Sequence, residues 1–175
     1  GLGDVYKRQL DDIENEVLRF LDIDTSIKKD RSEMYQKALA GSIEKGIELE
    51  FLDERLKNFD LDRLGNSIKA ENDLNFTFLG LQTLYDRYFI THEDTRYEMP
   101  QVFLMRVAMG LSIDEKDKND KAEEFYKLLS SFDYMSSTPT LFNSGTRRPQ
   151  LSSCYLTTVP DDLSGIYGAI HDNAM

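Results

Sequence analysis

The sequence is organised around one stretch near its C-terminal end, Ser137-Thr-Pro-Thr-Leu-Phe-Asn-Ser-Gly-Thr-Arg-Arg-Pro-Gln-Leu-Ser-Ser-Cys154. This stretch contains two of the four prolines and the only cysteine of the 175-residue chain. Its many Ser, Thr, Pro, Asn, Gly and Arg residues are typical of a loop with defined turns. The sequence before it has the apolar spacing of helices, and the sequence after it begins like a strand. We therefore expect the stretch to join two different kinds of structure.

Amphipathic helices are predicted for most of the chain before this stretch. Apolar residues recur at helical spacing in the segments 10–21, 32–46, 48–58, 60–68, 76–90, 98–111 and 122–132. Pro100 suits the first turn of a helix. Arg106, in the middle of an apolar segment, indicates an ion pair or a carbonyl contact inside the domain. Residues 1–9 lack an apolar stripe, and we expect them to be disordered or non-native.

The composition excludes several classes of protein. With 40% apolar and 30% charged residues the chain is expected to be globular. A net charge of −11 argues against partners such as nucleic acid or an anionic membrane, which need a positive surface. No apolar run is long enough for a transmembrane helix. The single cysteine excludes a disulfide within these residues, so we expect a cytoplasmic protein. No pattern of paired metal ligands is present.

The residues after the central stretch predict the beginning of a second domain. Residues 151–159 fit a strand rich in β-branched and aromatic residues, and Asp161 and Asp162 can cap a helix that continues with Leu163 and Ile166. A strand that leads into a helix opens a βα unit. One such unit cannot bury its own faces. We therefore expect a helical domain over 1–150 and an incomplete α/β domain over 151–175.

Two interpretations of Cys154 remain open at this point. Free cysteines are usually buried and behave as small apolar residues. Against this, Cys154 follows a loop rich in hydroxyl and basic donors, including Thr138, Ser144 and Arg147. Such donors suit an anionic ligand such as a phosphate ester. The residues alone do not provide a complete active site.

The central stretch closely resembles a known family. Residues 138–154 are similar to the loop and first barrel strand of the ribonucleoside-diphosphate reductase large (α) subunit. Two further stretches resemble the helical domain of that family: Leu79-Gly-Leu-Gln-Thr-Leu-Tyr-Asp-Arg-Tyr88 and Glu98-Met-Pro-Gln-Val-Phe-Leu-Met-Arg-Val-Ala-Met-Gly-Leu111. The resemblance covers roughly residues 10–175, and the three motifs occur in the family's order.

The resemblance implies a fold, a reaction and site residues. The fold would be mainly α, a helical N-terminal domain that leads into the first strand and helix of a ten-stranded α/β barrel, truncated here. The reaction would be radical reduction of ribonucleotides at the 2′ carbon. Cys154 resembles one member of the redox-active cysteine pair, whose partner would lie outside the chain. Thr138, Ser153 and Cys154 match substrate-contacting positions. Asp161, Asp162 and Leu163 match positions that contact the deoxynucleotide effector.

The resemblance also implies partners. No cofactor or metal would be bound directly by these residues. The radical would come from a metal-containing small subunit, or from cobalamin in related classes. Deoxynucleotides and ATP would act as effectors, and thioredoxin or glutaredoxin as reductant. The helix over 163–175 would pair two α subunits. Because the radical-bearing cysteine would lie outside this N-terminal fragment, the fragment alone is expected to be inactive.

A rival hypothesis comes from a different class of protein. A mainly helical, acidic chain also suits a non-catalytic interaction module in which Cys154 is structural. The two hypotheses differ in the loop over 138–154 and in the truncated βα unit, because an interaction module needs neither. A structure with Cys154 on the inner face of an incipient barrel strand, open to solvent, would support the enzyme.

Overall fold

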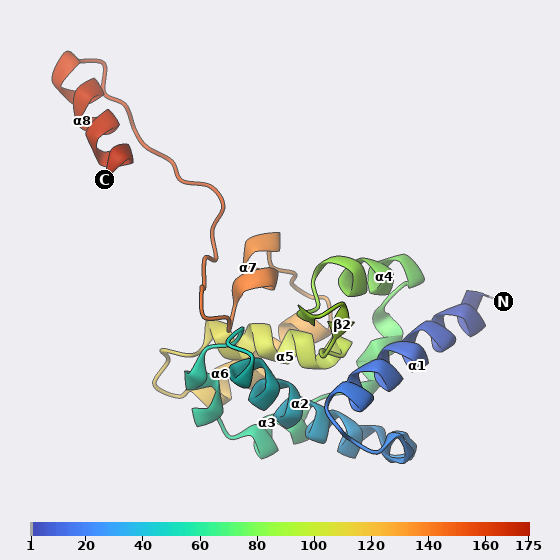
Figure 1. The fold of residues 1–175 in the computed structure, drawn as a ribbon. Coiled ribbons are helices and arrows are strands. Elements are labelled where there is room, and N and C mark those ends of the chain that lie inside the picture. Colours follow the sequence, from blue (N-terminus) through green and yellow to red (C-terminus); the bar gives the residue numbers. More distant parts are fainter. Residues whose placement is uncertain (1) are drawn as a thin grey trace.

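Helices make up most of residues 2–175, the part of the chain that the computed structural model describes (Figure 1). In chain order the elements are α1 (Leu2–Phe20), the 3₁₀ helix η1 (Thr25–Lys29), α2 (Arg31–Glu48), η2 (Glu54–Asn58), α3 (Leu61–Ser67), η3 (Ala70–Asn75), α4 (Phe78–Arg87), β1 (Thr91–His92), β2 (Thr95–Arg96), α5 (Pro100–Leu111), α6 (Lys118–Ser130), α7 (Thr138–Asn143) and α8 (Leu163–Ala174). The predicted mainly α fold is confirmed.

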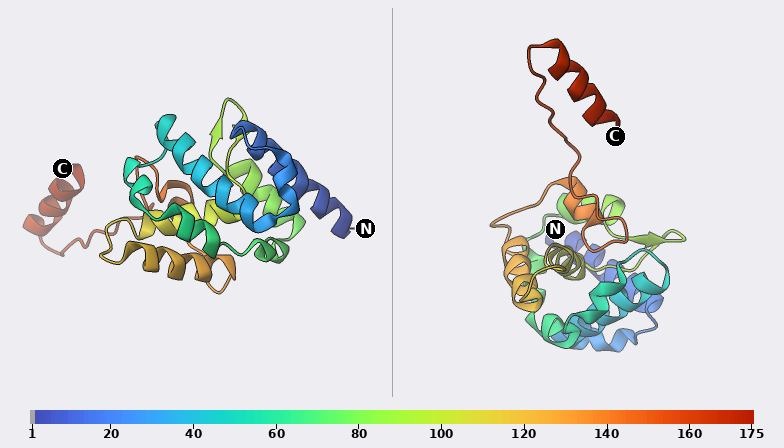
Figure 2. Two further views of the ribbon diagram at one scale, coloured as in Figure 1. Left: turned by 90° about the horizontal axis from the view of Figure 1, so that it is seen from below. Right: turned by 90° about the vertical axis from the view of Figure 1, so that its left-hand side faces the viewer.

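Helix α5 lies at the centre of the helical body. All of its residues from Pro100 to Met109 are buried, which explains why its sequence is apolar on every side. It packs against α6, α2 and α7, and Figure 2 shows the helices of the body arranged around it, with α8 apart. Pro100 stands in the first turn, as predicted. The core therefore forms around the helix that carries Arg106.

Aspartate side chains begin many of the helices. In each case a carboxylate oxygen accepts a hydrogen bond from a backbone N–H of the first turn. The residues concerned are Asp24, Asp30, Asp53, Asp60 and Asp162. These N–H groups have no partner within a helix, and a negative charge is favourable beside them. Part of the acidic character of the chain therefore stabilises helix ends.

The N-terminal helix begins earlier than the sequence predicts. Its apolar stripe starts at Leu10, but α1 begins at Leu2. Extending an existing helix adds one hydrogen bond for each residue that becomes ordered, so the extension needs no stripe of its own. The Tyr6 hydroxyl also donates a hydrogen bond to the carbonyl oxygen of Asp73. The structure therefore describes residues 2–9 as part of α1, and residue 1 lies outside the described residues.

Two connections differ from simple loops. The segment 48–58 is predicted to be helical, but only Glu54–Asn58 forms a 3₁₀ turn, and Leu52 pairs with Thr146 in an isolated bridge. The polar connection at 91–95 is a short antiparallel hairpin of β1 and β2. Its two turn residues have positive φ angles, 47° at Glu93 and 65° at Asp94, as tight hairpin turns require.

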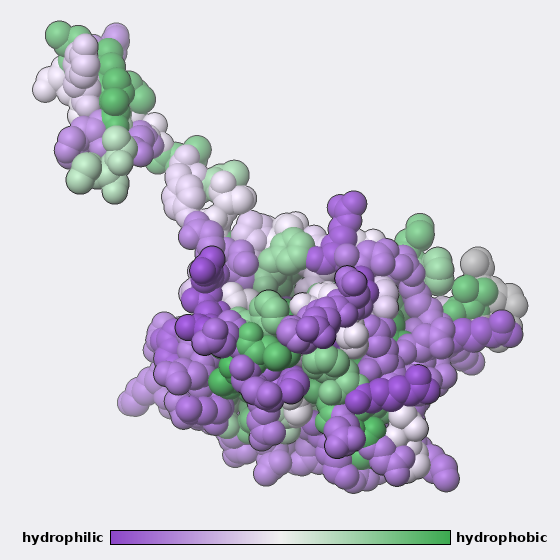
Figure 3. All heavy atoms as spheres, in the orientation of Figure 1, coloured by the Kyte–Doolittle hydropathy of each residue, from purple (hydrophilic) through white to green (hydrophobic). Residues whose placement is uncertain are grey.

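The predicted strand at 151–159 is not formed. Residues 149–162 lie in no helix or strand, and they carry α8 away from the helical body (Figures 1 and 2). A strand exists only when a neighbouring backbone completes its hydrogen bonds. The residues that the structure describes offer no such neighbour to this segment. Figure 3 shows apolar side chains on α8 and its linker that remain open to solvent.

Candidate functional site

The central stretch folds as a short helix followed by a sharp turn. Helix α7, with Pro139 in its first turn, is not predicted from the sequence, where this region is interpreted as a loop. Thr138 is exposed, and its hydroxyl oxygen lies 3.0 Å from that of Tyr88. The ring of Tyr88 also stacks on Phe142, with 4.6 Å between ring centroids and 15° between planes. The end of α4 therefore supports one side of α7.

The turn after α7 is fastened to α5. The Ser144 hydroxyl donates to the carbonyl oxygen of Val107 at 2.7 Å, and Ser144 is fully buried. Gly145 has a φ of +78°, and a Cβ there would lie 3.1 Å from the carbonyl oxygen of Arg106. A Cβ on Gly110 would lie 2.0 Å from the Gly145 nitrogen. Glycine is needed at both positions because the two backbones approach so closely.

Arg106 and Glu98 form a buried ion pair beneath this turn. Both side chains are at most 1% exposed. The Arg106 Nε and Nη2 atoms donate to the two Glu98 carboxylate oxygens at 2.8 and 3.2 Å. Its Nη1 donates to the carbonyl oxygens of Leu141 at 3.2 Å and Ser144 at 2.7 Å. The sequence predicts an ion pair or a carbonyl contact for Arg106, and the structure has both.

The segment that carries Cys154 begins on α7. The Asn143 side-chain amide donates to the carbonyl oxygen of Gln150 at 2.7 Å, and the Thr140 hydroxyl donates to that of Leu151 at 3.2 Å. Beyond these bonds the chain enters solvent. Cys154 is an exposed free thiol, 3.8 Å from the hydroxyl oxygen of the preceding serine. The hydrogen bonds thus tie the start of the cysteine segment to the helix that begins at Thr138.

The remaining predicted residues lie at the start of α8. Asp162 is its N-cap, and its carboxylate accepts a hydrogen bond from the Gly165 nitrogen at 2.8 Å. Asp161 and Leu163 are exposed beside it. Because α8 stands apart from the helical body in Figure 1, this group is not brought together with Thr138 in the structure. The cap that the sequence predicts at Asp162 is confirmed.

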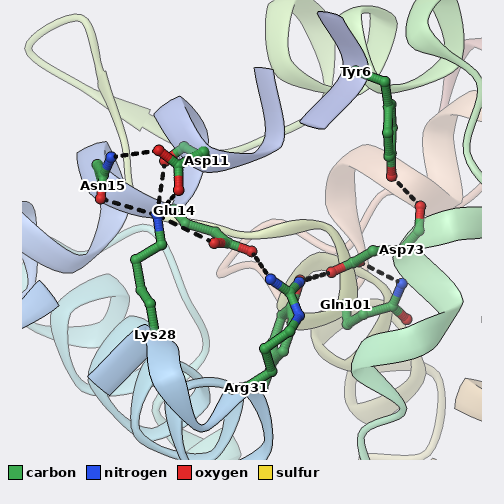
Figure 4. Close-up of polar contacts among 9 residues, drawn as sticks. Tyr6, Asp11, Glu14, Asn15, Lys28, Arg31, Asp73 and Gln101 are labelled. Carbon is green, nitrogen blue, oxygen red and sulfur yellow. Dashed lines mark hydrogen bonds and ion pairs between the residues drawn. The ribbon is translucent and has the colours of Figure 1, made fainter. Parts of the chain in front are cut away.

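A second polar cluster, which the sequence does not reveal, lies on the other side of α5 (Figure 4). Asp73 is 1% exposed and accepts hydrogen bonds from Tyr35 at 2.6 Å, Arg31 at 2.8 Å and Gln101 at 2.9 Å. Arg31 also pairs with the buried Glu14 at 2.8 Å. Burial raises the pKa of Asp73 to about 6, although the hydrogen bonds and the charge of Arg31 act against this rise.

A pocket of about 710 Å³ opens beside this second cluster. Its walls come from α1, from the start of α2 and from the segment 66–74. Cationic and acidic side chains both line it, including Lys7, Arg31, Lys69, Asp11 and Glu71. The polar atoms of Asp73 are already hydrogen-bonded within the protein. The cluster is therefore interpreted as a structural network that joins α1, α2, η3 and α5.

Residues 2–175 contain neither a cluster of metal ligands nor a helix that could span a membrane. Within this range no group of three or more His, Cys, Asp or Glu side chains is placed to hold a metal ion. No helix of the same range has the length and apolarity needed to cross a membrane.

Sequence comparisons relate the chain to enzymes of one kind. Residues 74–149 match the family model described as the all-alpha domain of ribonucleotide reductase. The ribonucleoside-diphosphate reductase subunit alpha of Chlamydia trachomatis is 57% identical over 125 residues, which are 71% of this chain and 12% of that protein. The subunit of Chlamydia pneumoniae is 51% identical over 145 residues, 82% of this chain and 14% of that protein. The subunit of Helicobacter pylori is 42% identical over 120 residues, 68% and 15% respectively. The chain thus spans between 12% and 15% of the length of these relatives.

Proposed function

The chain belongs to the family of ribonucleotide reductase large subunits, and on this premise we propose that its full-length protein reduces ribonucleotides to 2′-deoxyribonucleotides. The residues described above would supply the helical domain and one wall of the nucleotide site. The segment after residue 150 would form the first strand, and α8 the first helix, of a ten-stranded α/β barrel completed by sequence beyond this chain. The strand would then find the backbone partners that it lacks here.

The similarity to reductase large subunits is the observation that carries this proposal, with relatives that are 57% and 51% identical over 71% and 82% of the chain. This similarity favours the enzyme over the non-catalytic interaction module. Cys154 is exposed together with all residues from 152 to 164, and the start of its segment is fastened to α7 by two hydrogen bonds. A thiol on a segment held in this way suits a residue that must meet a substrate and later a reductant.

The proposed redox role of Cys154 balances with one partner cysteine outside the chain. The two thiols are oxidised to a disulfide and provide two electrons and two protons. At the 2′ carbon of the ribonucleotide the C–O bond breaks, the hydroxyl group leaves as water, and a C–H bond forms. A thiyl radical on a third cysteine, also outside the chain, removes the 3′ hydrogen at the start and returns it at the end. Thioredoxin or glutaredoxin would then reduce the disulfide.

Thr138 and Ser153 are proposed to hold the substrate. Both residues have exposed hydroxyl groups, and both lie on segments that are attached to the helical body through α7. A hydroxyl group can donate to an anionic or hydroxylated nucleotide and can also accept from it. Thr138 begins α7, and Ser153 follows the segment whose start α7 holds, so both would contact one ligand once the barrel strand is formed.

The start of α8 is proposed as an effector contact and its apolar face as a subunit contact. Asp161, Asp162 and Leu163 would meet a deoxynucleotide effector, and Asp162 would keep its role as helix cap. Leu163, Ile166, Tyr167 and Ile170 are all exposed. A helix with so many exposed apolar side chains needs a partner surface. A second α subunit would provide it. The radical would come from a separate metal-containing small subunit, or from cobalamin.

Substitution of Cys154 in the full-length subunit tests the proposal. Cys154→Ser should abolish repeated turnover with a dithiol protein reductant, measured as deoxynucleotide formation, while the circular dichroism spectrum stays unchanged. Ser152→Ala, two residues away on the same exposed segment, is the matched control and should keep wild-type activity. Wild-type rates in Cys154→Ser, or deoxynucleotide formation by the isolated 175-residue chain, would contradict the assignment.

A further inference from the structure

Helix α7 is too short to hold its own position. It has six residues, of which only Leu141 is buried, and so short a helix is marginal without tertiary contacts. Its position must therefore come from the surfaces that it touches. Two of these supports are polar side chains of other helices, and they approach α7 from different parts of the chain.

The first support is Arg106, which holds the C-terminal end of α7. Helix ends leave carbonyl oxygens without partners in the helix. The Arg106 Nη1 atom donates to the carbonyl oxygens of Leu141 and Ser144, at 3.2 and 2.7 Å. Arg106 is completely buried, so water cannot replace these bonds. Charged donors form stronger hydrogen bonds than neutral ones.

The second support is Tyr88, which lies along one side of α7 and contacts residues near both of its ends. Its ring stacks on Phe142, and its hydroxyl oxygen lies 3.0 Å from that of Thr138. Tyr88 stands at the C-terminal end of α4, where the chain turns towards the hairpin. In that turn the Tyr88 and Phe89 nitrogens donate to the carbonyl oxygen of Leu84, and the Ile90 nitrogen donates to Glu98 Oε2 at 3.0 Å.

Both supports therefore meet at Glu98. One carboxylate, 1% exposed, accepts two hydrogen bonds from Arg106 and one from the Ile90 nitrogen. We propose that Glu98 and Arg106 are positioning residues for the nucleotide site: together they set where α7 presents Thr138 relative to the segment that carries Cys154. This inference rests on the proposed function, because it assumes that Thr138 and Cys154 meet the same substrate.

The hydrogen bonds of the pair explain why other residues could not replace Arg106. An apolar side chain could fill the space of Arg106 but would leave two carbonyl oxygens buried without donors. A lysine has the same charge but a single nitrogen, which cannot reach the carboxylate and both carbonyls in the geometry of a planar guanidinium. The pair therefore fixes an orientation as well as filling the core.

Hydrogen exchange on the 175-residue chain tests the physical part of the proposal. Arg106→Lys should speed exchange at the amides of Leu141, Ser144 and Thr146 by about tenfold or more, because the charged support of the turn is weakened. The amides of α2 and α6 should keep wild-type protection. The Ile90 amide should also be unchanged, since Glu98 is still present to accept its hydrogen bond.

Two further variants make the test specific. Glu98→Gln should speed exchange both in α7 and at Ile90, because one amide oxygen cannot serve both donors. Arg63→Lys is the matched control: Arg63 is also a paired arginine, with Asp120 and Glu123 as partners, but it is exposed and lies on α3, which packs on α2 and α6. Arg63→Lys should leave the hydrogen-exchange rates of the α7 amides unchanged. Unchanged α7 protection in Arg106→Lys, or equal loss of protection in every helix, would overturn the positioning role. If Arg106→Lys does not fold, Glu98→Gln decides the same question.

Kinetics of the full-length subunit then test the functional part. Arg106→Lys should raise the KM for the ribonucleotide by about tenfold, because a misplaced α7 weakens substrate contacts. Arg63→Lys should keep the wild-type KM. A wild-type KM in an Arg106→Lys enzyme with loosened α7 would refute the positioning role and leave the proposed reaction intact. A wild-type subunit that forms no deoxynucleotide would instead refute the proposed function.

Discussion

Replacement of Asp73 by asparagine should change how the stability of the chain depends on pH. Asp73 is buried, and its carboxylate accepts hydrogen bonds from Tyr35, Arg31 and Gln101. Two opposing effects act on its charge. Burial disfavours the ionised form, whereas the three donors favour it. Burial is the larger effect, so the pKa is raised from 3.8 to about 6.

The sign and size of the effect follow from this shift. Between pH 3.8 and about 6 the folded chain binds the Asp73 proton more tightly than the unfolded chain does. The stability that Asp73 contributes is therefore complete below pH 4 and is lost as the pH rises through 6. Each pKa unit corresponds to about 1.4 kcal/mol, so the loss should approach about 3 kcal/mol. No large discount for solvent applies, because the side chain is 1% exposed.

Urea unfolding between pH 4 and 7, followed by circular dichroism, measures this loss. The free energy of unfolding of wild type minus that of Asp73→Asn should fall by about 3 kcal/mol over the range. Asp24→Asn is the control. Asp24 is an exposed cap whose pKa is lowered by hydrogen bonds from Ser26. The stability that it contributes is lost only as the pH falls below 4, so the difference between wild type and Asp24→Asn should stay nearly constant between pH 4 and 7. A flat Asp73 difference, or one that rises with pH, would refute the reasoning, because the hydrogen bonds would then outweigh burial.

One substitution and one deletion probe the segments around the site. Gly145→Ala should lower the free energy of unfolding by about 1–3 kcal/mol, because alanine is strained at a positive φ. Gly168→Ala is its control: a Cβ there meets nothing within 4 Å, so the free energy of unfolding of the helical body should not change. Removal of residues 153–175 should keep the thermal midpoint within about 2 °C of wild type, because the side-chain hydrogen bonds of α8 all join residues 157–174. A midpoint lowered by more than about 5 °C would mean that α8 packs on the body.

The sequence predicts the elements that local patterning determines. Apolar spacing indicates the long helices, and Pro100 marks the start of α5 correctly. The sequence also indicates that Arg106 is paired, because a charge inside an apolar helix needs a partner. The partner, Glu98, lies only eight residues earlier. An acidic residue just before an apolar helix that contains one arginine is a signal that could have identified the pair.

Elements that depend on partners distant in the sequence are not predicted by local patterns. The segment 151–159 has a strand composition, yet no strand forms, because strand formation needs another backbone. Helix α7 forms in a stretch of loop composition, because Arg106 and Tyr88 hold it. No sequence pattern indicates the polar cluster around Asp73. Its sequence neighbours look like a break between helices, and its donors come from α2 and α5.

Helix α5 connects the two polar clusters of the body. Its buried residues include only two with polar side chains, Gln101 and Arg106. Because they are five residues apart, they point about 140° away from each other around the helix axis. Gln101 bonds Asp73 on the side of α1 and α2, and Arg106 bonds Glu98 and the end of α7 on the other side. A polar residue inside an apolar helix is costly unless it is satisfied. Each of these two is satisfied only when α5 is rotated so that it faces its own cluster. The two networks therefore fix the rotation of α5 together, and the position of α7 depends on that rotation as well as on Arg106 itself.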